Sequence, residues 1–191
     1  MKAVVLHGKG SDHTSNWYDW VKTGLKKQGW EVWVPDLPGW DRPSARQGTK
    51  FLLNSGWDFE KNLVIGHSAG AVEILSLLQS LPKKTKINTA ILVGSFTKEL
   101  SEDPDWTTLA GLFTEPFDFT KIRQRVDKFI IVHSDDDPIC PLKQARELHT
   151  KLGGEFVLIP NAQHFSVSRS GLRFTKFPEL LEIIQQKVSY N

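Results

Sequence analysis

One serine lies in a setting that suits nucleophilic chemistry. Ser68 stands in Gly66-His67-Ser68-Ala69-Gly70, after a short apolar run and before an apolar helical segment. Gly-x-Ser-x-Gly between a strand and a helix is typical of a nucleophile elbow, where the glycines let the strand and helix backbones approach. The alternative is a tight turn with a solvated serine. We predict that Ser68 is a nucleophile.

A serine hydroxyl needs an adjacent base to take its proton, and that base needs an acid to orient it. His164 follows the last predicted strand, which is the place that the chain order Ser, Asp, His requires. Asp135, Asp136 and Asp137 end the preceding strand. We favour Asp137, because Pro138 fixes the backbone after it, and Asp136 remains the alternative. A solvated acidic turn or a divalent-ion site is also open, although no metal-ligand spacing is present nearby, so we predict no metal.

An oxyanion formed at the serine would need two N–H donors. The amide of Ala69 would supply one from the start of the helix. The amide of Lys9, in the loop His7-Gly8-Lys9-Gly10, is the candidate for the other. This loop can equally be a glycine-rich turn with no further role. It matches neither the dinucleotide nor the Walker phosphate-binding pattern.

Four further side chains are candidates for the substrate pocket. His7 and His67 stand at strand ends, and Trp106 and Phe113 lie in the segment 96–125. That segment breaks the alternation of strands and helices and carries prolines, acidic residues and aromatic residues. We expect one or two short helices in it, and either a lid over the site or a surface crossover packed on the sheet.

The chemistry-bearing residues follow elements that predict an α/β-hydrolase fold, with a mostly parallel, doubly wound sheet and helices on both faces. Apolar runs without alternation predict buried strands at 3–6, 31–34, 62–65, 90–93, 129–132 and 156–159. Amphipathic stretches predict helices at 17–27, 71–81, 142–152 and 178–188. Ligands bind at the carboxyl ends of such strands, where the polar motifs lie. We expect one domain over residues 1–191.

Composition excludes several classes of protein. The 24 Lys and Arg residues nearly balance 22 Asp and Glu residues and are scattered, which gives no support to nucleic acid binding. No apolar stretch approaches the length of a membrane span, so a soluble protein is expected. The single cysteine, Cys140, fits a reducing compartment, and we expect a cytoplasmic location. Cys140 itself is expected to be a buried apolar side chain rather than a second nucleophile.

The serine motif, Asp136-Asp137-Pro138 and Gln163-His164-Phe165 resemble those of the small α/β-hydrolases of the YdeN and retinoblastoma-binding serine hydrolase family. The likeness covers most of the chain. It implies a compact serine hydrolase acting on small esters or amides without a cofactor.

The retinoblastoma-binding motif, Leu-x-Cys-x-Glu, is absent here, so that partner is not expected and any protein partner stays unknown. We favour a carboxylesterase. An amide or peptide hydrolase, or a non-catalytic interaction module on the same fold, is the alternative.

Overall fold

Six parallel strands form one sheet at the centre of the computed structural model, which describes residues 1–97 and 106–188. The spatial order is β2-β1-β3-β4-β5-β6, and each neighbouring pair is parallel. The strands are β1 (Lys2–Leu6), β2 (Glu31–Trp33), β3 (Leu63–His67), β4 (Ile87–Val93), β5 (Val126–His133) and β6 (Glu155–Leu158). The order reverses beside β1, so the loops after β1 and β3 meet at one edge of the sheet.

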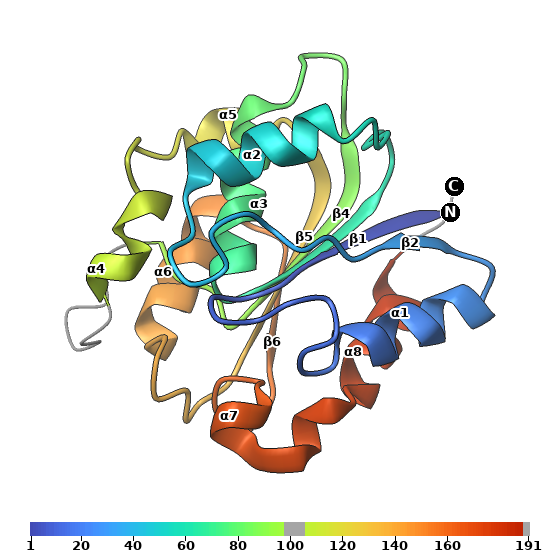
Figure 1. Cartoon of the computed structure of the whole chain (residues 1–191), viewed down its shortest axis with the longest axis vertical. Coiled ribbons are helices and arrows are strands. Elements are labelled where there is room, and N and C mark those ends of the chain that lie inside the picture. Colours follow the sequence, from blue (N-terminus) through green and yellow to red (C-terminus); the bar gives the residue numbers. More distant parts are fainter. Residues whose placement is uncertain (98–105, 189–191) are drawn as a thin grey trace.

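Helices cover both faces of this sheet (Figure 1). They are α1 (Tyr18–Lys27), α2 (Ala45–Asn54), α3 (Ala69–Ser80), α4 (Trp106–Leu109), α5 (Phe119–Arg123), α6 (Leu142–Leu152), α7 (Val167–Ser170) and α8 (Pro178–Lys187), with the 3-10 turns η1 (Ala110–Leu112) and η2 (Gly171–Thr175). Apolar residues of α1 and α8 form one core with the sheet, and those of α2, α3, α5 and α6 form the other. The architecture is that of an α/β-hydrolase, as the sequence predicts.

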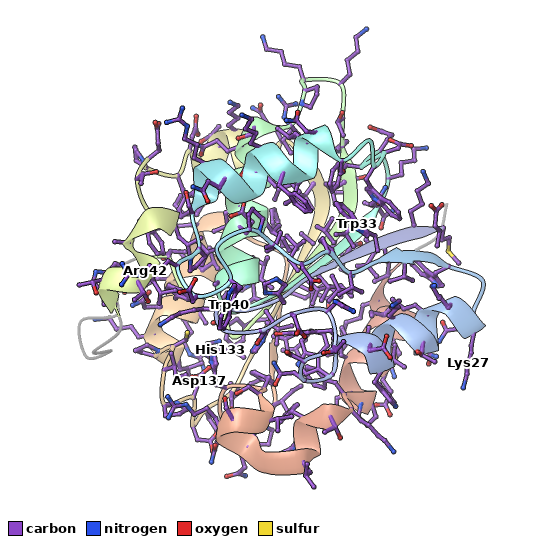
Figure 2. The ribbon with its side chains drawn as sticks, viewed as in Figure 1. Lys27, Trp33, Trp40, Arg42, His133 and Asp137 are labelled. Atoms are coloured by element: carbon purple, nitrogen blue, oxygen red, sulfur yellow. The ribbon has the colours of Figure 1, made fainter. Side chains whose placement is uncertain are left out.

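The strands are apolar because both of their faces are buried. Val4 and Val5, for example, point to opposite cores and are both fully buried. Side chains fill the space between the helices and the sheet, while Lys27 at the end of α1 points away from the molecule (Figure 2). Burial on both faces fixes the strands rigidly and therefore fixes the loops that follow them.

Helix α2 is an element that the sequence analysis did not predict. Its packing on α3 depends on Gly48, because a Cβ there would lie 2.6 Å from the Glu73 carboxyl group. Glu73 is 2% exposed, and its Oε1 accepts a 2.8 Å hydrogen bond from Thr49 Oγ1. Burial raises the pKa of Glu73 to about 8, so this carboxyl is mostly protonated at neutral pH.

The segment 96–125 carries short helices, as expected. Within its described part, α4, η1 and α5 follow one another, and Leu109 and Leu112 are buried against Ala69 and Phe96 in a third apolar cluster. Residues 98–105, the remainder of the predicted lid, lie outside the described residues.

Among the described helices, none is long and apolar enough to cross a membrane.

Candidate active site

Ser68 lies at the sharp turn between β3 and α3. Its backbone has φ of 53° and ψ of −118°, a combination that non-glycine residues rarely adopt. Gly66 and Gly70 make the turn possible. A Cβ on Gly66 would overlap the Gly70 carbonyl group, and one on Gly70 would overlap the carbonyl groups of Leu6 and His7. The turn therefore holds Ser68 at the carboxyl edge of the sheet.

His164 and Asp137 form a buried pair beside this turn. His164 Nδ1 lies 2.8 Å from Asp137 Oδ2, and the two side chains are 6% and 0% exposed. Asp137 Oδ1 accepts the N–H groups of Ile139 and Cys140, each at 2.9 Å. Burial alone would raise the pKa of Asp137, but the hydrogen bond and charge of His164 and the two N–H groups lower it. Asp137 is thus a carboxylate that orients the His164 imidazole.

The loop that carries His164 is held along its length by residues 134–137. Asp135 Oδ1 accepts the Asn161 N–H at 2.9 Å, and Ser134 Oγ accepts the Ala162 N–H at 3.0 Å. Asp136 Oδ1 accepts the Gln163 N–H at 2.7 Å. Together with the Asp137–His164 pair, these contacts join the two loops one residue after another. We call this set of four contacts the acid-loop clamp.

The clamp supports a strained backbone. Asn161, Gln163 and Phe165, which alternate with buried Ala162 and His164, have φ between 48° and 55°. Such left-handed conformations cost free energy in non-glycine residues and persist only where the surroundings impose them. The carboxylates of Asp135 and Asp136, which accept the N–H groups of Asn161 and Gln163, help to hold two of these three residues in place.

Gly94, just after β4, leaves room for the imidazole–carboxylate pair. A Cβ at this position would lie 3.4 Å from His164 Cε1 and 3.6 Å from Asp137 Oδ2, and its φ of 56° also favours glycine. The sequence analysis missed this residue. Its position at the end of a predicted strand is the signal that could have found it.

His67 fixes His164 from the other side. His67 Nε2 donates to the His164 carbonyl oxygen at 2.8 Å, so its Nδ1 is the acceptor of the Tyr18 hydroxyl at 2.7 Å. The Tyr18 oxygen in turn accepts the Gly8 N–H at 3.1 Å. Burial lowers the pKa of His67 to about 3 and raises that of Tyr18 to about 12, so both side chains are neutral. Tyr18, which the sequence analysis did not single out, links the loop after β1 to the His164 loop.

Of the residues around the two predicted oxyanion donors, Ala69 directly follows Ser68, and Gly8, the neighbour of Lys9, lies beside it. Ala69 begins α3, where helix N–H groups have no acceptor within the helix. Gly8 approaches so closely that a Cβ on it would lie 3.3 Å from Ser68 Cβ. The Gly8 N–H is already bound to Tyr18, which leaves the next residue, Lys9, as the predicted donor from this loop.

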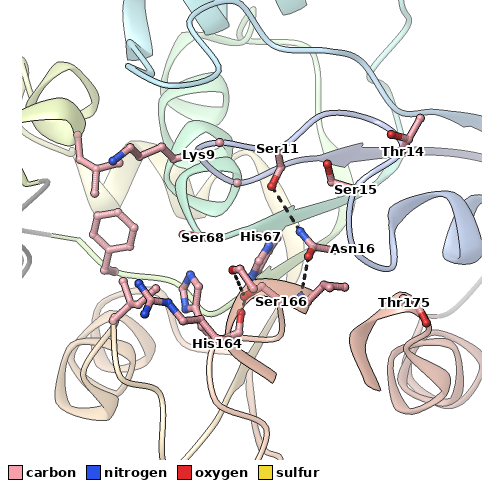
Figure 3. A pocket seen from close by; sticks show the side chains of 18 residues that line it. Lys9, Ser11, Thr14, Ser15, Asn16, His67, Ser68, His164, Ser166 and Thr175 are labelled. Carbon is pink, nitrogen blue, oxygen red and sulfur yellow. Dashed lines mark hydrogen bonds between the residues drawn. The ribbon is translucent and has the colours of Figure 1, made fainter. Parts of the chain in front are cut away.

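A cavity of about 690 Å³ opens onto Ser68 and His164 (Figure 3). Lys9 and His67 also line it, whereas His7, Trp106 and Phe113 are not among its lining residues. His7 Nε2 instead accepts the Leu37 N–H at 2.8 Å, and His7 lines a small neighbouring cavity. Among the described hydrogen bonds, none joins Ser68 Oγ to His164, a contact that commonly tightens only when substrate binds.

Trp106 and Phe113 contact each other, with ring centroids 5.3 Å apart, and pack on the third apolar cluster behind the cavity. Their role as pocket residues stays a prediction, since the adjoining residues 98–105 are outside the described part of the chain.

One group of side chains has atoms close enough to consider a metal. Ligand atoms of Asp137, Cys140 and His164 lie within 4.8 Å of one another among the described residues. Both Asp137 oxygens, however, already bind His164 and two backbone N–H groups. His133 ends β5, Asp137 lies in the loop beyond it (Figure 2), and Cys140 is fully buried. We assign no metal to this group.

The fold and the Ser68 region are those of a serine hydrolase, and the chain belongs to the serine hydrolase family, whose model matches residues 3–186. Serine hydrolase RBBP9 of Rattus norvegicus is 26% identical over 193 residues, which cover 98% of this chain and 96% of the rat protein. The family resemblance in the sequence is therefore confirmed.

Solved structures share the fold. The ydeN gene product of B. subtilis superposes with a TM-score of 0.87 at 22% identity, over 96% of each chain. A carboxylesterase of Nitrososphaera gargenis gives a TM-score of 0.73 at 15% identity, over 96% of this chain and 88% of that one.

Proposed function

We propose that the protein is a carboxylesterase that cleaves small esters through an acyl-enzyme, with Ser68 as nucleophile, His164 as base and Asp137 as the orienting acid. The observation that carries the proposal is the buried 2.8 Å contact between His164 Nδ1 and Asp137 Oδ2, at the cavity that also contains Ser68. Because Asp137 holds the proton of Nδ1, the other ring nitrogen, Nε2, is the one able to accept a proton from Ser68.

The reaction would proceed in two acyl transfers. His164 takes the Ser68 proton as Oγ attacks the ester carbonyl carbon, and the N–H groups of Ala69 and Lys9 stabilise the oxyanion. His164 then gives the proton to the leaving alkoxide, so that the alcohol departs. Water, deprotonated by His164, attacks the acyl-enzyme and releases the acid and Ser68. Every step uses side chains and N–H groups of this chain alone.

The nitrogen-containing alternatives, amides and peptides, would follow the same steps. Because one structure with the same fold is a carboxylesterase, we choose esters as the first substrates to test. A cytoplasmic location is part of the same proposal, and the single cysteine, Cys140, which is buried and forms no disulfide, is compatible with it.

A fluorophosphonate probe tests the proposal, because it labels only an activated serine. We expect labelling of the wild-type protein and of Ser80→Ala, a control at the exposed end of α3, and no labelling of Ser68→Ala. Folded wild-type protein that does not react would overturn the proposal in favour of a non-catalytic interaction module. Labelling with hydrolysis of amides but not of matched esters would favour an amidase.

A further inference from the structure

The cavity at Ser68 has two chemically different ends. Phe96, Leu109 and Ile139 line one part, and Phe96 and Leu109 are almost fully buried in the third apolar cluster. A second part is lined by polar side chains from two segments, the loop after β1 and the turns α7 and η2. We call this part the hydroxyl arm, and it consists of Thr14, Ser15, Asn16, Ser166, Ser168 and Thr175.

In Figure 3, Thr14, Ser15, Asn16 and Thr175 lie on the side of Ser68 away from Lys9, and Ser166 lies close to His164. Its two walls are joined, because the Val167 N–H donates to Asn16 Oδ1 at 2.9 Å. Asn16 Nδ2 also donates to the Tyr18 hydroxyl at 3.3 Å, which links the arm to the network behind His67. The arm is therefore a fixed part of the site.

Three hydroxyl groups of the arm already donate their protons to acceptors within the protein. Thr14 Oγ1 donates to Asp12 Oδ1 at 2.7 Å, and Ser15 Oγ donates to the same oxygen at 2.9 Å. Thr175 Oγ1 donates to the Leu172 carbonyl oxygen at 2.8 Å. Ser15 Oγ also accepts the Asp12 N–H at 3.1 Å, and each of the three hydroxyl oxygens keeps at least one lone pair that can accept a hydrogen bond. The arm thus presents acceptors to a ligand that brings its own O–H donors.

A few fixed polar groups in a cavity of this size set the orientation and specificity of a ligand. We propose, on the basis of the function proposed above, that the substrates are esters of polyhydroxylated alcohols. The apolar acyl chain would lie against Phe96, Leu109 and Ile139. The leaving alcohol would lie in the hydroxyl arm, with its hydroxyl groups donating to Thr14, Ser15 and Thr175, and Arg169 at the same cavity would donate to its oxygens.

A matched pair of substrates tests this inference. Glycerol 1-butyrate and propyl butyrate share the acyl group and the carbon chain of the alcohol, and they differ only in two hydroxyl groups. We expect kcat/KM at least about tenfold higher for the glycerol ester, which corresponds to one or two hydrogen bonds, after both rates are divided by the rates of alkaline hydrolysis.

The variants Thr14→Val and Thr175→Val remove hydroxyl groups from exposed positions and keep the shape of the side chain. In the double variant we expect the preference for the glycerol ester to fall to about twofold or less. Thr23→Val, on the exposed face of α1, is the control and should keep the wild-type preference.

Equal rates for the two esters, or a preference that survives in the double variant, would overturn the inference. If Ser68 is labelled by the fluorophosphonate probe in the same preparation, the proposed function stands in either case. If Ser68 is not labelled, both the proposed function and the proposed substrate class are wrong.

Discussion

The Gln163 N–H donates to Asp136 Oδ1 at 2.7 Å, and this bond lies one residue from the His164–Asp137 contact on both of the loops involved. Asp136 Oδ1 also accepts the Ser134 hydroxyl at 2.6 Å, and these two hydrogen bonds lower the pKa of Asp136. Asp136, the neighbour of Asp137, therefore holds the backbone of Gln163, the neighbour of His164. We therefore expect Asp136 to position His164.

Replacing Asp136 by alanine should lower kcat for ester hydrolysis about tenfold or more, with a smaller change in KM. The lost acceptor releases the Gln163 N–H and allows Gln163 to leave its strained φ of 48°, which moves His164 away from Ser68. Steady-state kinetics with a p-nitrophenyl ester, together with the rate of fluorophosphonate labelling, measure the effect.

Asp136→Asn provides the matched control, because an asparagine Oδ1 can still accept both hydrogen bonds. It should recover most of the activity. An Asp136→Ala variant that is folded and fully active would show that the remaining contacts of the clamp hold the loop unaided.

Gly94→Ala should lose both stability and activity. A left-handed φ of 56° costs an alanine about 1 kcal/mol, and the added Cβ would contact the His164 ring at 3.4 Å, so any shift that relieves the backbone strain acts on the ring. Gly29→Ala is the control: its φ of 84° imposes the same kind of backbone strain on an alanine, but nothing lies within 4 Å of the added Cβ. We expect similar losses in the free energy of unfolding, measured in urea, and a loss of activity only at Gly94. Equal activities of the two variants would mean that the contact of the added Cβ with His164 does not affect the reaction.

Glu73→Gln should change how stability depends on pH. The folded state keeps the Glu73 proton up to a pH of about 8, whereas the unfolded chain releases it near 4.5, so the wild-type protein loses stability as pH rises between these values. Glutamine keeps an acceptor for Thr49 and carries no charge. Relative to the wild type, the variant should therefore be more stable at pH 8 than at pH 5, by about 1.4 kcal/mol or more.

Denaturant unfolding at the two pH values checks this prediction, with Glu182→Gln on the exposed side of α8 as control. An identical difference between Glu73→Gln and wild type at pH 5 and pH 8 would mean that Glu73 is ionised in the folded protein.

Tyr18→Phe removes the hydroxyl that joins Gly8 to His67. The Gly8 N–H is then buried without its acceptor, which costs about 1–3 kcal/mol, and the loop that carries Lys9 loses its attachment to the His164 side of the site. We expect a lower kcat at nearly unchanged KM, because the affected groups act on the oxyanion and the base. Unchanged kcat in a destabilised variant would restrict Tyr18 to a role in folding.

Much of the fold can be predicted from the sequence because parallel strands buried on both faces are apolar throughout. The helix predicted at 142–152 is confirmed as α6, and that at 178–188 ends one residue earlier, as α8. Helix α2 escaped prediction because its apolar residues are few and Gly48 interrupts it. The reason for that glycine, the carboxyl group of Glu73, is a contact across two elements.

In the candidate site too, residue types and their order can be predicted from the sequence, whereas contacts between distant elements cannot. The types and order of Ser68, Asp137 and His164 are visible in the chain, and their geometry supports the roles predicted for them. The contributions of Asp136, Gly94 and Tyr18 depend on contacts between residues 10 to 70 positions apart, such as Gly94 with His164, which no local pattern encodes. The same holds for the left-handed backbone at Gln163 and Phe165, residue types that rarely adopt this conformation.

The order of the acid-loop clamp along the chain has a consequence during protein synthesis. β1, β3 and β4 and the Ser68 turn are all complete before Ser134 is made, whereas the clamp residues and His164 itself follow between positions 134 and 164. With the function proposed above, a nascent chain that has emerged only as far as β5 lacks His164 and should present an unreactive serine. Reactivity towards acyl groups in the cell should therefore begin only with the docking of the last strand and its loop, so that translation itself times the onset of the chemistry.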